Sequence, residues 1–259
     1  MIDKKKLKEY GFIQFNIKDV DEVLYNQLSD VIEEGPEKYQ EDLRIVRTSF
    51  LEPYDNLSNT HQLLGDANGY QIEMLDYDER ENGRLTKLTV IFKSFELAQE
   101  FRNRVYQPHR TFEQFWHYNM GLPEQTKPIV YKIFEKIIDE VYNKKLLSDK
   151  ITFEFTWYGK GCVISSHEDV WSGDLPDPMK QCSILLYLNK HSYDETDGGY
   201  LCVDNDKHKV YPKFGNVAMI EYDHIAREHR VEPPKTEYGR YGFLSFVDRR
   251  FIVPKPSVI

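Results

Sequence analysis

The chain has little of the cysteine chemistry that would define a small stapled protein. It contains three cysteines, Cys162, Cys182 and Cys202, which are 20 residues apart and form no C-x-x-C pair. An odd number of thiols without metal-ligand spacing argues against a disulfide framework and against a structural zinc site. We therefore expect the three cysteines to be small buried side chains of a protein in a reducing compartment.

Long apolar segments and an excess of positive charge are also lacking. No stretch approaches the roughly 18 apolar residues of a membrane-spanning helix, and the charged start, MIDKKKLKEYGFIQF, does not have the composition of a signal peptide. The net charge of −9 makes a nucleic-acid backbone a poor partner. These absences predict a soluble, cytoplasmic protein that binds neither membrane nor nucleic acid, and they leave its oligomeric state open.

The first 150 residues combine helical and extended patterns. Apolar residues recur at helical spacing over 19–34 after an aspartate cap, and GFIQFNI before them is typical of a strand. Two β-rich runs flank ENG within 70–92 and predict either a hairpin or a strand followed by a turn. The segments SFELAQEFRNRVYQ and KPIVYKIFEKIIDEVYNKK predict two amphipathic helices.

From about residue 151 the pattern changes to eight short β-rich runs, separated by Gly, Pro, Asn or Asp. Such spacing favours an antiparallel sandwich or jelly roll. We therefore expect a mainly β fold with flanking helices (α+β), in which residues 1–150 support a β core of residues 151–259 within one continuous domain. The mouth of such a barrel is a natural ligand site.

The segment SSHEDVWSG, residues 165–173, holds a pair of metal-binding side chains. On an extended strand, His167 and Asp169 point to one face and Glu168 to the other. An imidazole and a carboxylate suit divalent iron or zinc, although chance gives about one such pair in a chain of this composition. A third ligand must come from downstream, where the candidates are His191, His208, His224 and His229.

His229 is followed by RVEPPKTEYGRYGFLSF, in which Arg240 begins another β-rich run. A proline-containing turn would let the two runs pair and bring both side chains to one cavity. Two histidines and one carboxylate occupy one face of an octahedron and leave three positions open, as in non-haem Fe(II) oxygenases. Arg240 is suited to bind a carboxylate in bidentate fashion.

Five motifs follow one another in a specific order between Tyr158 and Asp248. They are YGKGCVISSHED, SILLYLNK, DGGYLCV, VYPKFGNVAMIEY and HRVEPPKTEYGRYGFLSF. The ordered set resembles the 2-oxoglutarate- and Fe(II)-dependent dioxygenases, particularly the prolyl 4-hydroxylase-like branch. The resemblance implies a double-stranded β-helix, the jelly-roll core that cupins also have.

The resemblance also implies roles for individual residues. His167, Asp169 and His229 would bind iron, while Arg240 would hold the far carboxylate of 2-oxoglutarate and Tyr158 would face the co-substrate or substrate. His224 is the competitor of His229, but Val231, Pro233 and Arg240 are in register with His229. Some animal relatives have a tyrosine before Y-L-N where this chain has Leu186, so a second hydroxyl partner comes from elsewhere or is absent.

The implied reaction is hydroxylation of an unactivated C–H bond. It would use Fe(II) as cofactor, consume 2-oxoglutarate and O2, and release succinate and CO2. Ascorbate is a further candidate cofactor. The branch favours a prolyl residue of a peptide or protein as substrate, and the alternative is a free amino acid or another small metabolite. From a different class, the barrel could be a non-redox cupin-like metal-binding or scaffold protein.

The segment DVWSGDLPDPMK, between the metal motif and the next β-rich run, is long for a hairpin connection. It is either an ordinary loop or a substrate lid. In the second interpretation Trp171 would shield the site and contact substrate, and Asp174 or Asp177 would meet a cationic group.

Overall fold

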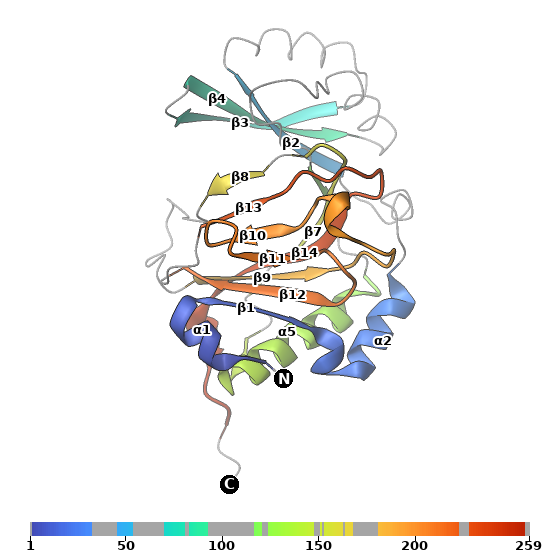
Figure 1. The fold of residues 1–259 in the computed structure, drawn as a ribbon, viewed down its shortest axis with the longest axis vertical. Coiled ribbons are helices and arrows are strands. Elements are labelled where there is room, and N and C mark those ends of the chain that lie inside the picture. Colours follow the sequence, from blue (N-terminus) through green and yellow to red (C-terminus); the bar gives the residue numbers. More distant parts are fainter. Residues whose placement is uncertain are drawn as a thin grey trace.

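The computed structural model describes residues 2–32, 46–53, 70–80, 83–92, 117–120, 124–147, 151, 153–162, 164–167, 181–222 and 228–256 (Figure 1). Its strands form two large antiparallel layers, and helices α1, α2 and α5 lie together at one end of the view. Within the described residues, no helix is long and apolar enough to cross a membrane.

The N-terminal segment contains helix α1 (Lys4–Tyr10), strand β1 (Phe12–Asn16), the 3-10 turn η1 (Ile17–Asp19) and helix α2 (Glu22–Val31). Asp21 caps α2, because its side chain accepts a hydrogen bond of 3.0 Å from the Leu24 amide. The predicted strand and the predicted helix after it are confirmed. Helix α1 was not predicted.

The middle of the chain supplies strands β2 (Val46–Pro53), β3 (Tyr70–Arg80), β4 (Gly83–Phe92) and β5 (His117–Met120). Strands β3 and β4 pair antiparallel, which confirms the predicted hairpin. The helix predicted for SFELAQEFRNRVYQ lies outside the described residues.

Helix α5 (Lys127–Tyr142) confirms the second amphipathic prediction. A proline lies in its first turn, where the missing amide hydrogen costs nothing. The helix ends at Asn143, which adopts the left-handed conformation with φ of 53°.

The C-terminal part is built almost entirely from short strands. They are β6 (Lys145–Leu146), β7 (Glu154–Tyr158), β8 (Ile164–His167), β9 (Gln181–Tyr187), β10 (Leu201–Val203), β11 (His208–Val210), β12 (Asn216–Glu221), β13 (His229–Val231), β14 (Arg240–Asp248) and β15 (Ile252–Val253), with the 3-10 turns η6 (Glu195–Asp197) and η8 (Arg249–Phe251). Each of the eight predicted β-rich runs contains one strand, from β7 to β14.

These strands belong mainly to two sheets. One has nine strands in the order β1-β12-β9-β14-β7-β5-β2-β4-β3, and the other has four in the order β11-β10-β13-β8. Strands from the first half extend the large sheet at both sides, because β1 pairs with β12 and β5 pairs with β7. The expected double-stranded β-helix with supporting helices is confirmed.

Two apolar clusters fill the fold, one on each face of the large sheet. The first packs α1, α2 and α5 against the outward side chains of β9 and β14, and it includes the buried Cys162 and Cys182. The second lies between the two sheets. All three cysteines are free and at most 1% exposed, as predicted.

Strand β9 shows how alternation assigns side chains to these clusters. Ile184 and Leu186 belong to the helix-facing cluster, whereas Leu185 and Tyr187 belong to the cluster between the sheets. Successive side chains of a strand point to opposite faces. Of these four residues, Leu185 and Tyr187 therefore face the interior of the barrel.

Candidate active site

Two of the predicted metal ligands lie side by side on the four-stranded sheet. His167, the last residue of β8, is the direct cross-strand partner of His229, the first residue of β13. Their ring centroids are 4.4 Å apart and the rings are inclined at 51°. The register shifts just after His229, and such a bulge changes the direction of the side chains that follow. The structure thus brings together two imidazoles that are 62 positions apart in the chain.

The remaining histidine candidates within the described residues lie in other environments. The His208 ring stacks on Phe12 at 5.4 Å. The His191 ring packs between Tyr193 and Tyr238, at 5.2 Å and 4.5 Å. His229 is therefore the candidate that the fold pairs with His167.

The other predicted residues of this region, Asp169, Trp171, Asp174, Asp177 and His224, lie outside the described residues. In the part of the chain that is described, no three His, Cys, Asp or Glu side chains are grouped as a metal site would require. Two adjacent imidazoles fit a divalent transition metal, and the proposed carboxylate ligand Asp169 follows β8 by two residues.

Arg240 is the first residue of β14 and is only 3% exposed. Its guanidinium lies between two aromatic rings, with Cζ 4.9 Å from the centre of Tyr158 and 5.1 Å from that of Tyr187. Its buried Nε and Nη1 have no hydrogen-bond partner within the described residues. Stacking on rings offsets part of the cost of burying the charge, and the two unused donors are suited to bind an anion.

The backbone on both sides of Arg240 is fixed by one buried side chain. Asn189 Nδ2 donates to the Gly239 carbonyl at 3.0 Å, and its Oδ1 accepts from the Tyr241 amide at 2.9 Å. Gly239 adopts φ of 62°, and a Cβ atom there would lie 2.3 Å from the Tyr158 carbonyl oxygen. The Asn of Y-L-N and the Gly of Gly-Arg therefore position the arginine.

The connection between His229 and Arg240 is held by backbone hydrogen bonds to two other loops. Gly199 N donates to Glu232 O at 2.7 Å, Gly161 N to Pro234 O at 2.8 Å, and Lys235 N to Asp197 O at 2.8 Å. These bonds tie the imidazole on one sheet to the guanidinium on the other. The loop is part of a rigid frame rather than a free linker.

The two tyrosines that flank Arg240 remain neutral at physiological pH. Burial raises the pKa of Tyr187 to about 12, and the Arg240 charge lowers it by less. Burial likewise raises the pKa of Tyr158, with Arg240 acting in the opposite direction. Both phenols therefore keep their protons and can donate hydrogen bonds to an anion.

Tyr187 is a site residue that the sequence reasoning missed. The comparison with relatives directed attention to Leu186, but Leu186 packs in the helix-facing cluster and Tyr187 points between the sheets. The Tyr187 hydroxyl is buried and has no hydrogen-bond partner among the described residues. Alternation along SILLYLNK was the signal that could have found it.

Comparison with known proteins gives a family match over the C-terminal part of the chain. Residues 153–248 match the family model described as the 2OG-Fe(II) oxygenase superfamily. This match covers most of the β-rich C-terminal part of the chain. No curated protein matches the chain.

Solved structures with similarity to the chain include three prolyl hydroxylases. A Pseudomonas putida prolyl-4-hydroxylase has 15% identity and a TM-score of 0.44, over 95% of this chain and 96% of that one. A Trichoplax adhaerens prolyl hydroxylase, solved with a peptide fragment of hypoxia inducible factor, has 14% identity and a TM-score of 0.44 over 96% and 88%. A viral collagen prolyl hydroxylase from Paramecium Bursaria Chlorella virus-1 has 18% identity and a TM-score of 0.36 over 49% and 74%.

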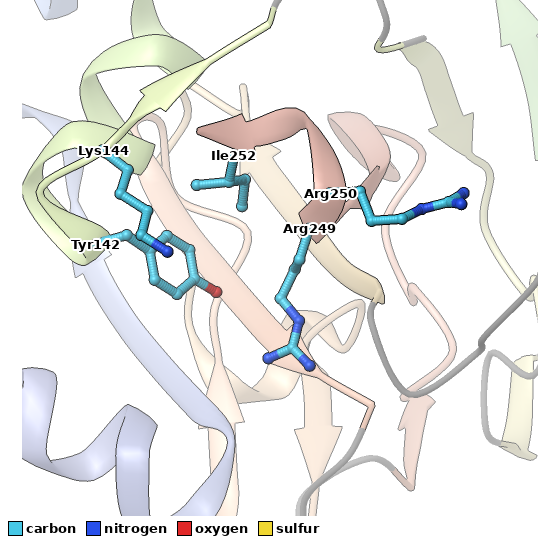
Figure 2. Close-up of a pocket in the computed structure, with 5 residues that line it drawn as sticks. All are labelled: Tyr142, Lys144, Arg249, Arg250 and Ile252. Atoms are coloured by element: carbon cyan, nitrogen blue, oxygen red, sulfur yellow. The ribbon is translucent and has the colours of Figure 1, made fainter. Parts of the chain in front are cut away.

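A separate cavity of about 310 Å³ lies beyond the end of β14, where Tyr142, Lys144, Arg249, Arg250 and Ile252 line it (Figure 2). Its two arginines are already paired, Arg249 with Glu221 and Arg250 with Asp248. Figure 2 shows the Arg250 side chain extending away from Tyr142. Both arginines of this cavity therefore have a counter-charge, whereas the described residues supply none for Arg240.

Proposed function

We propose that the protein is an Fe(II)- and 2-oxoglutarate-dependent dioxygenase that hydroxylates an unactivated C–H bond, most readily that of a prolyl residue in a peptide or protein, and releases succinate and CO2. The observation that carries the proposal is the buried guanidinium of Arg240, whose Nε and Nη1 lack partners in the described part of a domain that matches this superfamily. A fold that buries a positive charge without a counter-charge leaves the counter-charge to a ligand.

His167 and His229, with Asp169 as the third ligand, would hold the iron on the four-stranded sheet. When bound together, iron, 2-oxoglutarate and O2 supply the oxidising chemistry. The protein contributes position and water exclusion. Arg240 binds the far carboxylate of the co-substrate, Tyr187 donates to the same group, and Tyr158 packs on the other face of the guanidinium.

The resemblance of five ordered motifs to the prolyl 4-hydroxylase-like branch supports a prolyl substrate. A net charge of −9 suits a basic peptide better than an acidic one. Trp171 is the proposed substrate contact. A free amino acid or other small metabolite is the alternative within the same reaction class, since Arg240 and the histidine pair serve either substrate.

A non-redox cupin-like scaffold protein is the candidate from a different class. It would use the two imidazoles to hold a metal, but it would have no need for an arginine buried between two tyrosines. The Arg240 cluster therefore favours the enzyme.

The test is release of CO2 from 2-oxoglutarate labelled at C1, with Fe(II) and O2 and with or without a panel of prolyl peptides, free amino acids and small metabolites. We expect slow release by the protein alone, faster release with the true substrate, and a mass gain of one oxygen in that substrate. His167→Ala and anaerobic samples serve as controls. Binding of iron without any 2-oxoglutarate-dependent release, across the panel, would leave the scaffold as the better assignment.

A further inference from the structure

Tyr193 is a buried tyrosine whose hydroxyl has no hydrogen-bond partner within the described residues. It is 2% exposed and lies in the loop between β9 and η6, after the Y-L-N strand. Leaving a buried hydroxyl without a partner costs free energy comparable to that of a lost hydrogen bond. The Tyr193 hydroxyl is therefore available to donate a hydrogen bond to a ligand.

Several observations place Tyr193 at the Arg240 cluster. Its ring centroid lies 5.2 Å from that of His191, which stacks at 4.5 Å on Tyr238, two residues before Arg240. Burial raises the pKa of Tyr193, and the Arg240 charge lowers it by less. The hydroxyl also lies against Gly199, where a Cβ atom would come within 2.2 Å of it. Gly199 N donates to Glu232 O in the loop that leads to Arg240. The glycine thus leaves room for the phenol beside that loop.

The chemistry of a carboxylate matches the donors gathered here. A carboxylate has about four acceptor positions, and a guanidinium occupies two of them in a bidentate pair. Two positions remain, and the buried hydroxyls of Tyr187 and Tyr193, which have no hydrogen-bond partner among the described residues, can donate to them. Both phenols stay protonated at neutral pH because burial raises their pKa.

We propose that the Tyr193 hydroxyl, together with Arg240 and Tyr187, binds the far carboxylate of the co-substrate and thereby selects a dicarboxylic 2-oxoacid. The inference rests on the proposed function and adds a residue from a different loop to the anion site. Tyr193 lies six positions beyond Tyr187 and is not part of the Y-L-N motif.

Tyr193→Phe removes only the oxygen and keeps the ring that packs on His191 at 5.2 Å. Tyr238→Phe is the matched control, because Tyr238 packs on the other side of His191 and is 61% exposed. The probes are 2-oxoglutarate and 2-oxovalerate, which have the same number of carbons but differ in the far carboxylate. Their binding is measured by equilibrium dialysis, or by competition, on the zinc-loaded protein, which cannot turn over.

We expect Tyr193→Phe to weaken 2-oxoglutarate binding about tenfold, because a hydrogen bond to a charged group is lost. The same variant should bind 2-oxovalerate as the wild type does, and Tyr238→Phe should change neither probe. In the iron enzyme the KM for 2-oxoglutarate should rise about tenfold, while kcat at saturation stays within about twofold.

Equal weakening of both probes, or unchanged 2-oxoglutarate binding, overturns the role of Tyr193. The proposed function survives that result if the wild type binds 2-oxoglutarate and an Arg240 variant does not. If the wild type itself fails to bind 2-oxoglutarate, the proposed function fails and the role of Tyr193 falls with it.

Discussion

Two arginines lie at the two ends of strand β14, and they differ in whether a described residue pairs with their charge. Arg240 begins the strand, is 3% exposed, and has buried nitrogens without partners in the described residues. Arg249 follows the end of the strand, and its Nη1 lies 3.2 Å from Oε1 of Glu221. The Tyr142 hydroxyl also donates to that carboxylate at 2.5 Å. Among the described residues, Arg249 therefore has a counter-charge and Arg240 has none.

The difference separates a structural arginine from a binding one. Glu221 is 5% exposed, and its two partners tie strand β12 to helix α5 and to the turn after β14. The Glu221 carboxylate and the Arg249 guanidinium neutralise each other, so a ligand would have to break this pair in order to bind to either group. In the Arg240 cluster, by contrast, the guanidinium and the Tyr187 hydroxyl have no acceptor among the described residues.

Arg240→Met is the change with the largest expected effect. The dissociation constant for 2-oxoglutarate should rise at least about thirtyfold, because truncating one partner of a buried charged pair costs about 2–5 kcal/mol. Calorimetric titration of the zinc-loaded protein measures it. The ligand-free variant should unfold at an unchanged or higher urea concentration, since an uncompensated charge has been removed. A large loss of stability without ligand would mean that Arg240 has a structural counter-charge after all.

Arg249→Met should have the reverse profile. It leaves the buried Glu221 carboxylate with the Tyr142 hydroxyl, and the free energy of unfolding should fall by about 2 kcal/mol. Urea unfolding followed by circular dichroism gives the value. Affinity for 2-oxoglutarate should stay within about twofold of the wild type. Arg249→Met would then lower stability alone, whereas Arg240→Met would lower affinity alone. Loss of affinity in Arg249→Met would contradict the assignment of a structural role to Arg249 and a binding role to Arg240.

Tyr187→Phe should raise the KM for 2-oxoglutarate about fivefold to tenfold, because one hydrogen bond to a carboxylate is removed. Steady-state succinate formation measures the effect at saturating prime substrate. Leu186→Ala is the contrast, because Leu186 faces the helices and its truncation should lower stability and leave KM unchanged. A KM change in Leu186→Ala that matched the one in Tyr187→Phe would argue against the assignment of faces along β9.

The smallest effect concerns pH. Burial raises the pKa of Tyr187 to about 12, so its neutral, donating form persists well below that value. The KM for 2-oxoglutarate should therefore change less than twofold between pH 7 and pH 9. If the phenol instead ionised in this range, its negative charge would repel the carboxylate and KM would rise with pH. Initial rates in buffers that do not chelate iron distinguish these outcomes.

Much of the fold was predictable because its signals are local. Helix α2 has an aspartate cap, α5 has a proline in its first turn, and each of the eight short runs after residue 151 has β-rich residues between turn formers. The β3–β4 hairpin follows from two such runs around ENG. Helix α1 was missed, because seven residues with a single buried apolar side chain carry almost no periodic signal.

The candidate site was predictable only in part. His167, His229 and Arg240 were singled out because five ordered motifs resemble a known family, and the structure places the two imidazoles side by side. Tyr187 was passed over in favour of its neighbour Leu186, and Tyr193 was not considered. A tyrosine is common in β-rich sequences, and its residue type does not reveal whether its hydroxyl has a partner.

By itself, the sequence determined which residue types were available for chemistry and the order of strands that would carry them. Pattern and turn residues act over a few positions, so they can be seen in one chain without coordinates. The tertiary structure alone decided that His167 lies opposite His229 and that Arg240 lacks a counter-charge in the described residues where Arg249 has one. Pairing between distant strands and the presence or absence of a buried partner depend on contacts across the whole fold, and no local pattern records them.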